Sequence, residues 1–201
     1  MMKSAAVALL AGAGLAASIG AEEVAEPRSG TTFPSRVGDK SLLGLGLRTK
    51  TFLKVKVYAI GLYVADSALS GPLGAHRGRT DSPGFFEALV QGDFPKRITM
   101  KFLRDLSSSQ IQEAMRDALG GADRTRVDTF VGYFPAVRSG EECVLEWAPG
   151  GTLDTTMAGA PRPPIADRAF ASAVFAIWLG EKPVQDDLKK ALVSRAKELV
   201  R

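Results

Sequence analysis

Arg48 and Tyr58 are the two side chains whose types suggest chemistry in this chain. They lie among mostly apolar neighbours in residues 42–64, LLGLGLRTKTFLKVKVYAIGLYV. A guanidinium is always charged and presents a planar fork of N–H donors that fits a carboxylate. A nearby tyrosine hydroxyl would complete an anchor for an anionic head group and leave the apolar strands to hold a hydrophobic tail. The residues alone leave a second interpretation open, in which Arg48 is a surface arginine beside a turn.

The spacing of this pair constrains the chain between them. On one unbroken strand, ten residues at about 3.3 Å each would separate Arg48 from Tyr58 by roughly 33 Å, too far for one carboxylate. The pair can cooperate only if the chain turns, and residues 49–51 are the plausible place. After that point apolar residues alternate with polar ones, which is typical of an antiparallel strand. Residues 42–64 should therefore hold two strands, or one that is strongly bent.

The rest of the chain reads as strands followed by helices. We expect a short edge strand at 31–37, a strand at 97–106 and a hairpin at 142–159. Residues 66–82 should form a short helical turn and a loop. Helices are expected at 85–94, 110–119 (capped by one of Ser107–Ser109), 122–137, 167–179 and 186–200. This order favours an α+β fold over a doubly wound sheet.

Composition excludes several function classes. The chain has 201 residues and a formal charge of +4. It contains no stretch of five or six like charges, so the sequence does not predict nucleic acid binding. Cys143 cannot form an internal disulfide, and with His76 as the single histidine it cannot make a zinc cluster. We expect Cys143 to be a buried, inert thiol. A Cys–His catalytic pair is arithmetically possible, but His76 lies in a Gly/Arg-rich stretch typical of a loop.

Enzyme signatures with a known mechanism are absent from the sequence. It contains no P-loop, no GxGxxG followed by a helix, no GxSxG and no HExxH. The adjacent carboxylates Asp186 and Asp187 open a predicted helix, where the helix dipole explains them without catalysis. Arg104 and Asp105 resemble a structural ion pair at a strand end. We therefore expect no catalytic residue, no metal and no cofactor.

The N-terminus has the pattern of a targeting segment. One lysine precedes an Ala/Gly-rich apolar run over residues 5–20, and Ala21 is followed by two glutamates. We expect residues 1–21 to be a signal peptide, 22–29 a linker and 30–201 one domain. An uncleaved anchor is the alternative. The predicted destination is the periplasm, the secretory pathway or a plastid, with no stable membrane span after signal removal.

Three segments in order are similar to the chalcone isomerase fold family, and in particular to its non-catalytic, fatty-acid-binding branch. They are GLGLRTKTFLKVKVYAIGLYV, FLRDLSSSQIQEAMRDAL and FASAVFAIWLGEKPVQDDLKKAL, so the resemblance covers roughly residues 30–200. It implies an open-faced β-sandwich, in which a large antiparallel sheet carries helices on one side and a ligand cleft lies between them. Arg48 matches the family's cleft arginine, and Tyr58 matches the tyrosine that holds a carboxylate with it in this branch.

The resemblance also implies a departure from the true isomerases. Their catalytic-site tyrosine and asparagine correspond here to Ile111 and Ala118, and a flavonoid-contacting threonine or serine corresponds to Ile177. Ring closure of a chalcone needs a polarised ketone and a stabilised phenolate, which apolar side chains do not provide. These replacements suit a long apolar ligand. The candidate tail-lining residues are Leu103, Ile111, Met115, Ile177 and Trp178.

Three functions follow, in order of preference. The first is binding of fatty acids or similar amphipathic carboxylates without catalysis, through Arg48 and Tyr58. The second is an isomerase that acts on a chalcone-like or other small substrate on the same fold. The third is an accessory or scaffold protein that has no small ligand.

Overall fold

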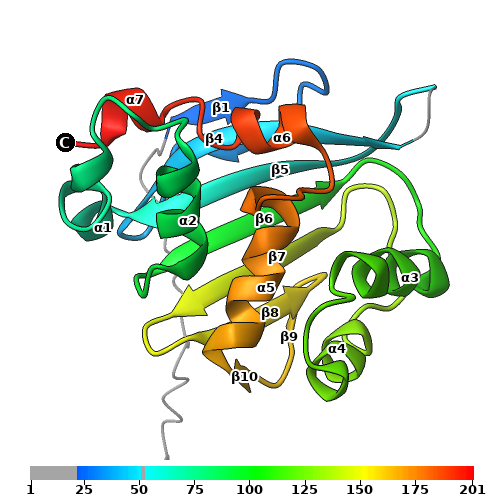
Figure 1. Cartoon of the computed structure of the whole chain (residues 1–201). Helices are drawn as coiled ribbons and strands as arrows, with labels where there is room; N and C mark the ends of the chain where they lie inside the picture. Colours follow the sequence, from blue (N-terminus) through cyan, green and yellow to red (C-terminus); the bar gives the residue numbers. More distant parts are fainter. Residues whose placement is uncertain (1–21, 51–52) are drawn as a thin grey trace, which may run out of the picture.

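One curled antiparallel sheet forms the centre of the molecule. The structure, a computed structural model, describes residues 22–50 and 53–201. Strands follow the order β10–β8–β7–β6–β5–β4–β3, and β9 pairs with β8 (Figure 1). Their bounds are β3 Arg36–Val37, β4 Lys40–Lys50, β5 Val55–Ala65, β6 Lys96–Phe102, β7 Glu142–Ala148, β8 Thr152–Met157, β9 Ala160–Pro161 and β10 Ile165–Ala166.

The helices pack against one side of this sheet, as Figure 1 shows. They are α1 Asp66–Ser70, a 3-10 turn at Gly74–His76, α2 Pro83–Gln91, α3 Ser108–Ala118, α4 Arg124–Val131, α5 Arg168–Leu179, α6 Asp186–Ala191 and α7 Ala196–Leu199. The helix α5 crosses the middle of the sheet, and α3 and α4 lie beside it. The expected α+β open-faced sandwich is confirmed.

Local sequence explains where α3 begins. The Ser107 hydroxyl accepts a hydrogen bond from the backbone N–H of Gln110, whose side chain in turn accepts from the Ser107 N–H. This capping box satisfies two backbone donors that the helix itself leaves free. Ile111 and Met115 form the buried face of α3. The cap thus fixes the residue at which α3 begins.

The opposite side of the sheet is covered by a short hairpin, β1 Glu23–Ala25 and β2 Thr32–Pro34. Phe33 from this hairpin is fully buried in a small cluster of its own. The cluster comprises Phe33, Leu42, Leu45, Ala59 and Tyr63. Residues 22–29 were expected to form a linker. Within this segment, residues 23–25 form β1 and pair with β2.

The C-terminal helix is shorter than the apolar periodicity suggested. We expected one helix over 186–200, but α6 ends at Ala191 and α7 begins at Ala196. Between them the backbone N–H of Arg195 donates to the carbonyl oxygen of Leu43 in β4, at 3.0 Å. The chain leaves the helix because it bonds to the sheet at this point.

Two further sequence expectations can be compared with the structure. Cys143 is fully buried on β7, and burial raises the pKa of its thiol far above the ordinary value. It is therefore the inert thiol that was predicted. Across residues 22–50 and 53–201, no helix has the length and apolar character needed to cross a membrane.

Candidate functional site

Arg48 and Tyr58 lie directly opposite each other on neighbouring strands. β4 and β5 form a hairpin in which Arg48 pairs with Tyr58, so the turn that the spacing required is present. Thr49 and Lys50 still belong to β4, and residues 51–52 are outside the described part of the chain. Directly paired residues share one face of a sheet, with Cβ atoms about 4.5–5.5 Å apart. The hairpin thus places the guanidinium and the phenol side by side.

Two glycines bring a helix up to the same strand. A Cβ atom at Gly44 would lie 2.4 Å from the Ala191 carbonyl oxygen, and one at Gly46 would lie 2.2 Å from Leu188 Cδ1. Only residues without a side chain allow α6 to approach this closely. Gly44, Gly46 and Arg48 occupy every second position of β4 and therefore lie on the same face of the strand. The helix that packs on the two glycines consequently begins beside the arginine. The residue preceding α6, Gln185, is thereby carried to Arg48.

Gln185 holds the Arg48 side chain in place. Arg48 Nη1 donates to Gln185 Oε1 at 3.1 Å and to the Thr49 carbonyl oxygen at 2.9 Å. The same Gln185 oxygen accepts from the Thr49 N–H at 3.0 Å. Within the described residues, Arg48 has no carboxylate within salt-bridge distance, and its Nη2 and Nε atoms donate to no protein atom. The guanidinium is thus oriented, and no carboxylate of the described residues forms an ion pair with it.

Tyr58 is buried and keeps its proton. Its side chain is 9 % exposed, and its Oη accepts a hydrogen bond from Trp178 Nε1 at 2.9 Å. Burial raises the pKa of Tyr58, although the Trp178 bond and the Arg48 charge act in the opposite direction. We find no acceptor for the phenolic proton among residues 22–50 and 53–201. Tyr58 is therefore a neutral phenol with one unused donor beside Arg48.

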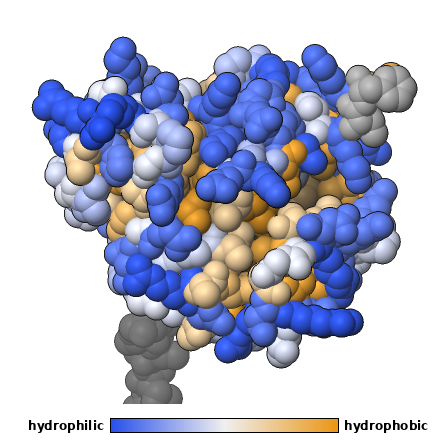
Figure 2. Space-filling model, viewed as in Figure 1, coloured by the Kyte–Doolittle hydropathy of each residue, from blue (hydrophilic) through white to orange (hydrophobic). Residues whose placement is uncertain are grey.

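A cavity of about 340 Å³ opens next to this pair. Its volume lies at the lower end of the range usual for small-molecule sites. Apolar side chains from β5, β6, α3 and α5 form most of the wall, and charged ones occupy the strand ends and one side of α3. The lining residues are Arg48, Lys50, Val55, Val57, Tyr58, Met100, Phe102, Arg104, Leu106, Gln110, Ile111, Glu113, Ala114, Met115, Asp117, Ala118, Ile177, Trp178 and Val184. Figure 2 shows an apolar hollow, surrounded by hydrophilic residues, on the face that carries the helices.

Most of the residues proposed from sequence meet in this cavity. It is lined by Arg48, Tyr58, Ile111, Met115, Ile177 and Trp178. Leu103 is the exception, and its assignment to the tail-lining set needs correction. Side chains alternate along a strand, so Phe102 faces the cavity and Leu103 faces away. Leu103 packs instead against the Phe33 cluster on the other side of the sheet.

Sequence reasoning missed several residues of the site, among them Phe102, Arg104 and Gln185. Phe102 could have been found, because it continues the alternation of Ile98 and Met100. Arg104 was interpreted as a partner of Asp105, but Asp105 accepts from the Ser139 N–H while Arg104 lines the cavity. The sequence around Gln185 does not indicate a role at the site, because only the packing of α6 on β4 brings this residue to Arg48.

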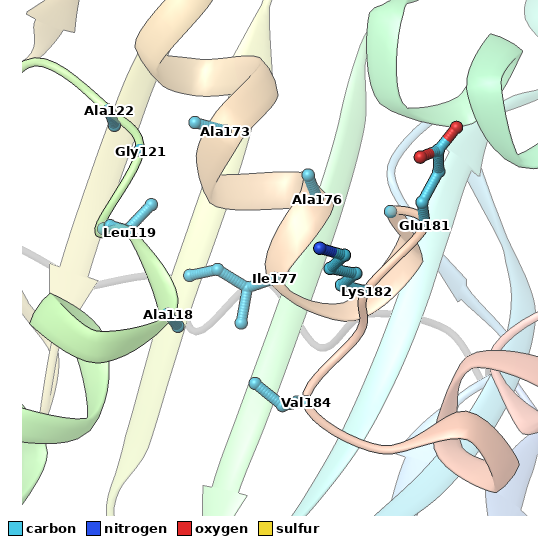
Figure 3. A pocket seen from close by; sticks show the side chains of 11 residues that line it. Ala118, Leu119, Gly121, Ala122, Ala173, Ala176, Ile177, Glu181, Lys182 and Val184 are labelled. Carbon is cyan, nitrogen blue, oxygen red and sulfur yellow. The ribbon is translucent and has the colours of Figure 1, made fainter.

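A second hollow, of about 430 Å³, lies between the end of α3 and the second half of α5. Figure 3 shows its lining side chains, most of which are short. They are Ala118, Leu119, Gly121, Ala122, Ala173, Ala176, Ile177, Gly180, Glu181, Lys182 and Val184. Ala118, Ile177 and Val184 also line the first cavity. The two spaces therefore share a wall.

The geometry is suited to holding an anionic head next to an apolar body. Arg48 provides the charge and the neutral Tyr58 provides a hydrogen bond, while the remaining wall is largely apolar. A neutral phenol with a raised pKa is a poor general base at neutral pH. We find no group of three or more His, Cys, Asp or Glu residues that could hold a metal ion in residues 22–50 and 53–201.

Comparisons with known proteins identify the family and the fold of this chain. A family model described as chalcone isomerase-like matches residues 29–194. A fatty-acid-binding protein from Arabidopsis thaliana is 24% identical over 89% of this chain and 72% of its own length. A chalcone–flavanone isomerase from Clitoria ternatea is 27% identical, over 86% and 85%. The crystal structure of an Arabidopsis thaliana fatty-acid-binding protein superposes with a TM-score of 0.75 at 22% identity, and covers 89% of this chain and 99% of that one. At this identity, the superposition establishes the fold.

Proposed function

Because the chain belongs to the chalcone isomerase-like family, we propose that it binds fatty acids or similar amphipathic carboxylates without catalysis. The carboxylate lies between Arg48 and Tyr58. The acyl chain occupies the apolar cavity between the sheet, α3 and α5. A relative and a structural neighbour named as fatty-acid-binding proteins support this ligand class.

The observation that carries the proposal is the pairing of two unused donors at one end of an apolar cavity. Arg48 has free N–H groups and no acidic partner among the described residues, and Tyr58 has a proton with no acceptor there. A carboxylate satisfies both. A hydrogen bond to a charged group contributes about 1.5–3 kcal/mol, whereas each buried methylene contributes about 0.8 kcal/mol. The head therefore selects the ligand, and the tail supplies most of the affinity.

The wall chemistry supports binding over isomerisation. The positions at which the family's isomerases carry polar groups are Ile111, Ala118 and Ile177, and all three line the cavity. None of them can polarise a ketone or stabilise a phenolate. The Tyr58 phenol, held neutral by burial, donates a hydrogen bond but does not accept a proton. Turnover of naringenin chalcone above its spontaneous rate would contradict this part of the proposal.

Replacement of Arg48 by glutamine tests the head-group assignment. We expect Arg48→Gln to weaken laurate binding about ten- to hundredfold, as loss of a charge-assisted bond implies. Binding of lauryl alcohol, which has the same tail, should change little. Isothermal titration calorimetry measures both ligands, and the exposed Arg138 provides a matched control in Arg138→Gln. Equal losses for the acid and the alcohol would reject the carboxylate site.

Two further measurements distinguish the proposal from its alternatives. Tyr58→Phe removes the phenolic donor and keeps the ring that packs edge-on against Phe102, so it should weaken the acid less than Arg48→Gln does. Lipid extraction from the purified protein, followed by mass spectrometry, should recover fatty acids. If no acid co-purifies and none binds in calorimetry, a scaffold without a small ligand is the better account.

A further inference from the structure

The cavity beside Arg48 is called the inner cavity and the second hollow the outer hollow. We propose that the outer hollow receives the far end of a long acyl chain, which reaches it from the inner cavity past Ala118, Ile177 and Val184. This rests on the proposed function and adds a length specificity to it. Short acids fill the inner cavity alone. Long acids occupy both spaces and gain affinity from the outer one.

The wall that the two spaces share is the first argument. Both volumes are lined by Ala118 at the end of α3, by Ile177 of α5 and by Val184 of the following loop. The Val184 N–H donates to the Ile177 carbonyl oxygen at 2.9 Å, which folds this loop back against α5. These three residues therefore form the boundary that an acyl chain has to pass between the two spaces. All three side chains are apolar, so a chain of methylenes meets no unpaired polar side chain among them.

The short side chains of the outer hollow are the second argument. Ala122 lies on one wall, and Ala173 and Ala176 lie one helical turn apart on the other. In Figure 3 these side chains, with Leu119 and Ile177, face a common space. The alanines are only half-buried although they pack against the core. Each leaves room that a larger apolar residue would fill, and an acyl chain is an occupant of matching shape and polarity.

The difference in charge between the outer hollow and Arg48 favours one orientation of the ligand. Glu181 and Lys182 stand at the outer edge, where both are exposed. Because their charges are opposite and adjacent, the pair has no net charge that would attract a carboxylate. Arg48 lies at the other end, half-buried and without a carboxylate partner in the described chain. The carboxylate therefore binds at Arg48, and the terminal methyl group points toward the outer hollow.

A series of fatty acids of increasing length tests this inference on variants in which a larger side chain fills the outer hollow. Calorimetry with octanoate, laurate, palmitate and stearate measures how affinity rises with length, at about fourfold per methylene buried. In Ala176→Leu the added side chain occupies the outer hollow, so the rise should stop at a shorter acid while octanoate binds as in the wild type. Ala169→Leu, on the exposed side of the same helix, is the matched control and should follow the wild type. Ala122→Leu fills the hollow from the opposite wall. It provides a second, independent test in case one of the two variants does not fold.

The outcomes separate this inference from the proposed function. If folded Ala176→Leu and Ala122→Leu keep the wild-type length limit, the outer hollow does not hold the chain, while acid binding itself stands. If Lys182→Gln weakens palmitate as much as Arg48→Gln does, the ligand is reversed and the inference is overturned. If the wild type binds none of the acids, the proposed function fails and the extension fails with it.

Discussion

Lys96 shows how far a single residue can depart from its usual environment in this fold. It is fully buried on β6, and its Nζ atom donates to the carbonyl oxygens of Leu89, Val90 and Gly92, at 2.8, 3.3 and 2.8 Å. The ammonium also lies 3.8 Å from the ring centroid of Trp147. It thus caps the C-terminal end of α2, where the helix dipole favours a cation. Burial nevertheless lowers the pKa of Lys96 to about 7.

This lowered pKa predicts how stability depends on pH. Between about pH 7 and pH 10 the unfolded chain binds a proton at Lys96 more readily than the folded one, so the unfolding free energy should rise with pH. Lys96→Met should flatten that rise. It should also cost about 1–3 kcal/mol at pH 7, because the α2 carbonyls lose their donor. Urea unfolding at pH 7, 8 and 9 measures both effects, with Lys101→Met as control. An unchanged pH slope in Lys96→Met would contradict the assignment.

At the scale of elements, the contact between α6 and β4 positions the site. The helix rests on Gly44 and Gly46, and the residue that precedes it, Gln185, binds Arg48. The two glycines are not equivalent. A Cβ at Gly44 would meet backbone atoms of Ala191 and Leu192, whereas one at Gly46 would meet the end of the flexible Leu188 side chain. Backbone cannot rotate away as a side chain does.

We therefore expect Gly44→Ala to be more damaging than Gly46→Ala. Gly44→Ala should lower the unfolding free energy by about 1–3 kcal/mol, the usual cost of overpacking, and Gly46→Ala by clearly less. Because a shifted α6 moves Gln185, Gly44→Ala should also weaken laurate binding. Urea denaturation and calorimetry on the pair of variants provide the measurements. Equal losses for the two glycines would show that α6 adjusts freely.

At the scale of the whole molecule, the two sides of the sheet are covered differently, and the proposed ligand site lies on one of them. One side of the sheet is closed by the β1–β2 hairpin and its Phe33 cluster. The other side carries the helices (Figure 1), with the inner cavity between the sheet, α3 and α5, and the outer hollow between α3 and α5 (Figure 3). The proposed ligand site therefore lies between the sheet and the helices, where apolar walls and a few polar groups converge.

The N-terminal segment adds a prediction about the complete chain. Residues 1–21 lie outside the described residues, and we propose that they are a signal peptide that directs export. Because Lys3 is their only charged residue, cleavage would change the formal charge from +4 to +3. The intact mass of the exported protein should correspond to a chain that begins at Glu22. Ala21→Arg should block the cleavage, because the site needs a small residue. An exported wild-type chain that keeps residues 1–21 would favour an uncleaved anchor.

Periodicity and capping predicted most of the elements because they are local properties. The alternation along β6 and the Ser107 cap of α3 can be recognised in short stretches of sequence. The break between α6 and α7 could not be predicted, because the bond from Arg195 to Leu43 joins residues far apart in the chain. The side of the sheet taken by Leu103 was misjudged although the alternation contained the answer.

The sequence by itself determined the residue types at the site: one arginine, one tyrosine and apolar neighbours, with a turn required between the two. It also determined the strand and helix periods that place side chains on faces. Only the tertiary structure decided that Arg48 lies opposite Tyr58 and that Gln185 orients the Arg48 side chain. It also decided that Trp178 donates a hydrogen bond to the Tyr58 hydroxyl. The physical reason is range. Periodicity acts over a few residues, whereas a cavity is formed by strands and helices from opposite ends of the chain.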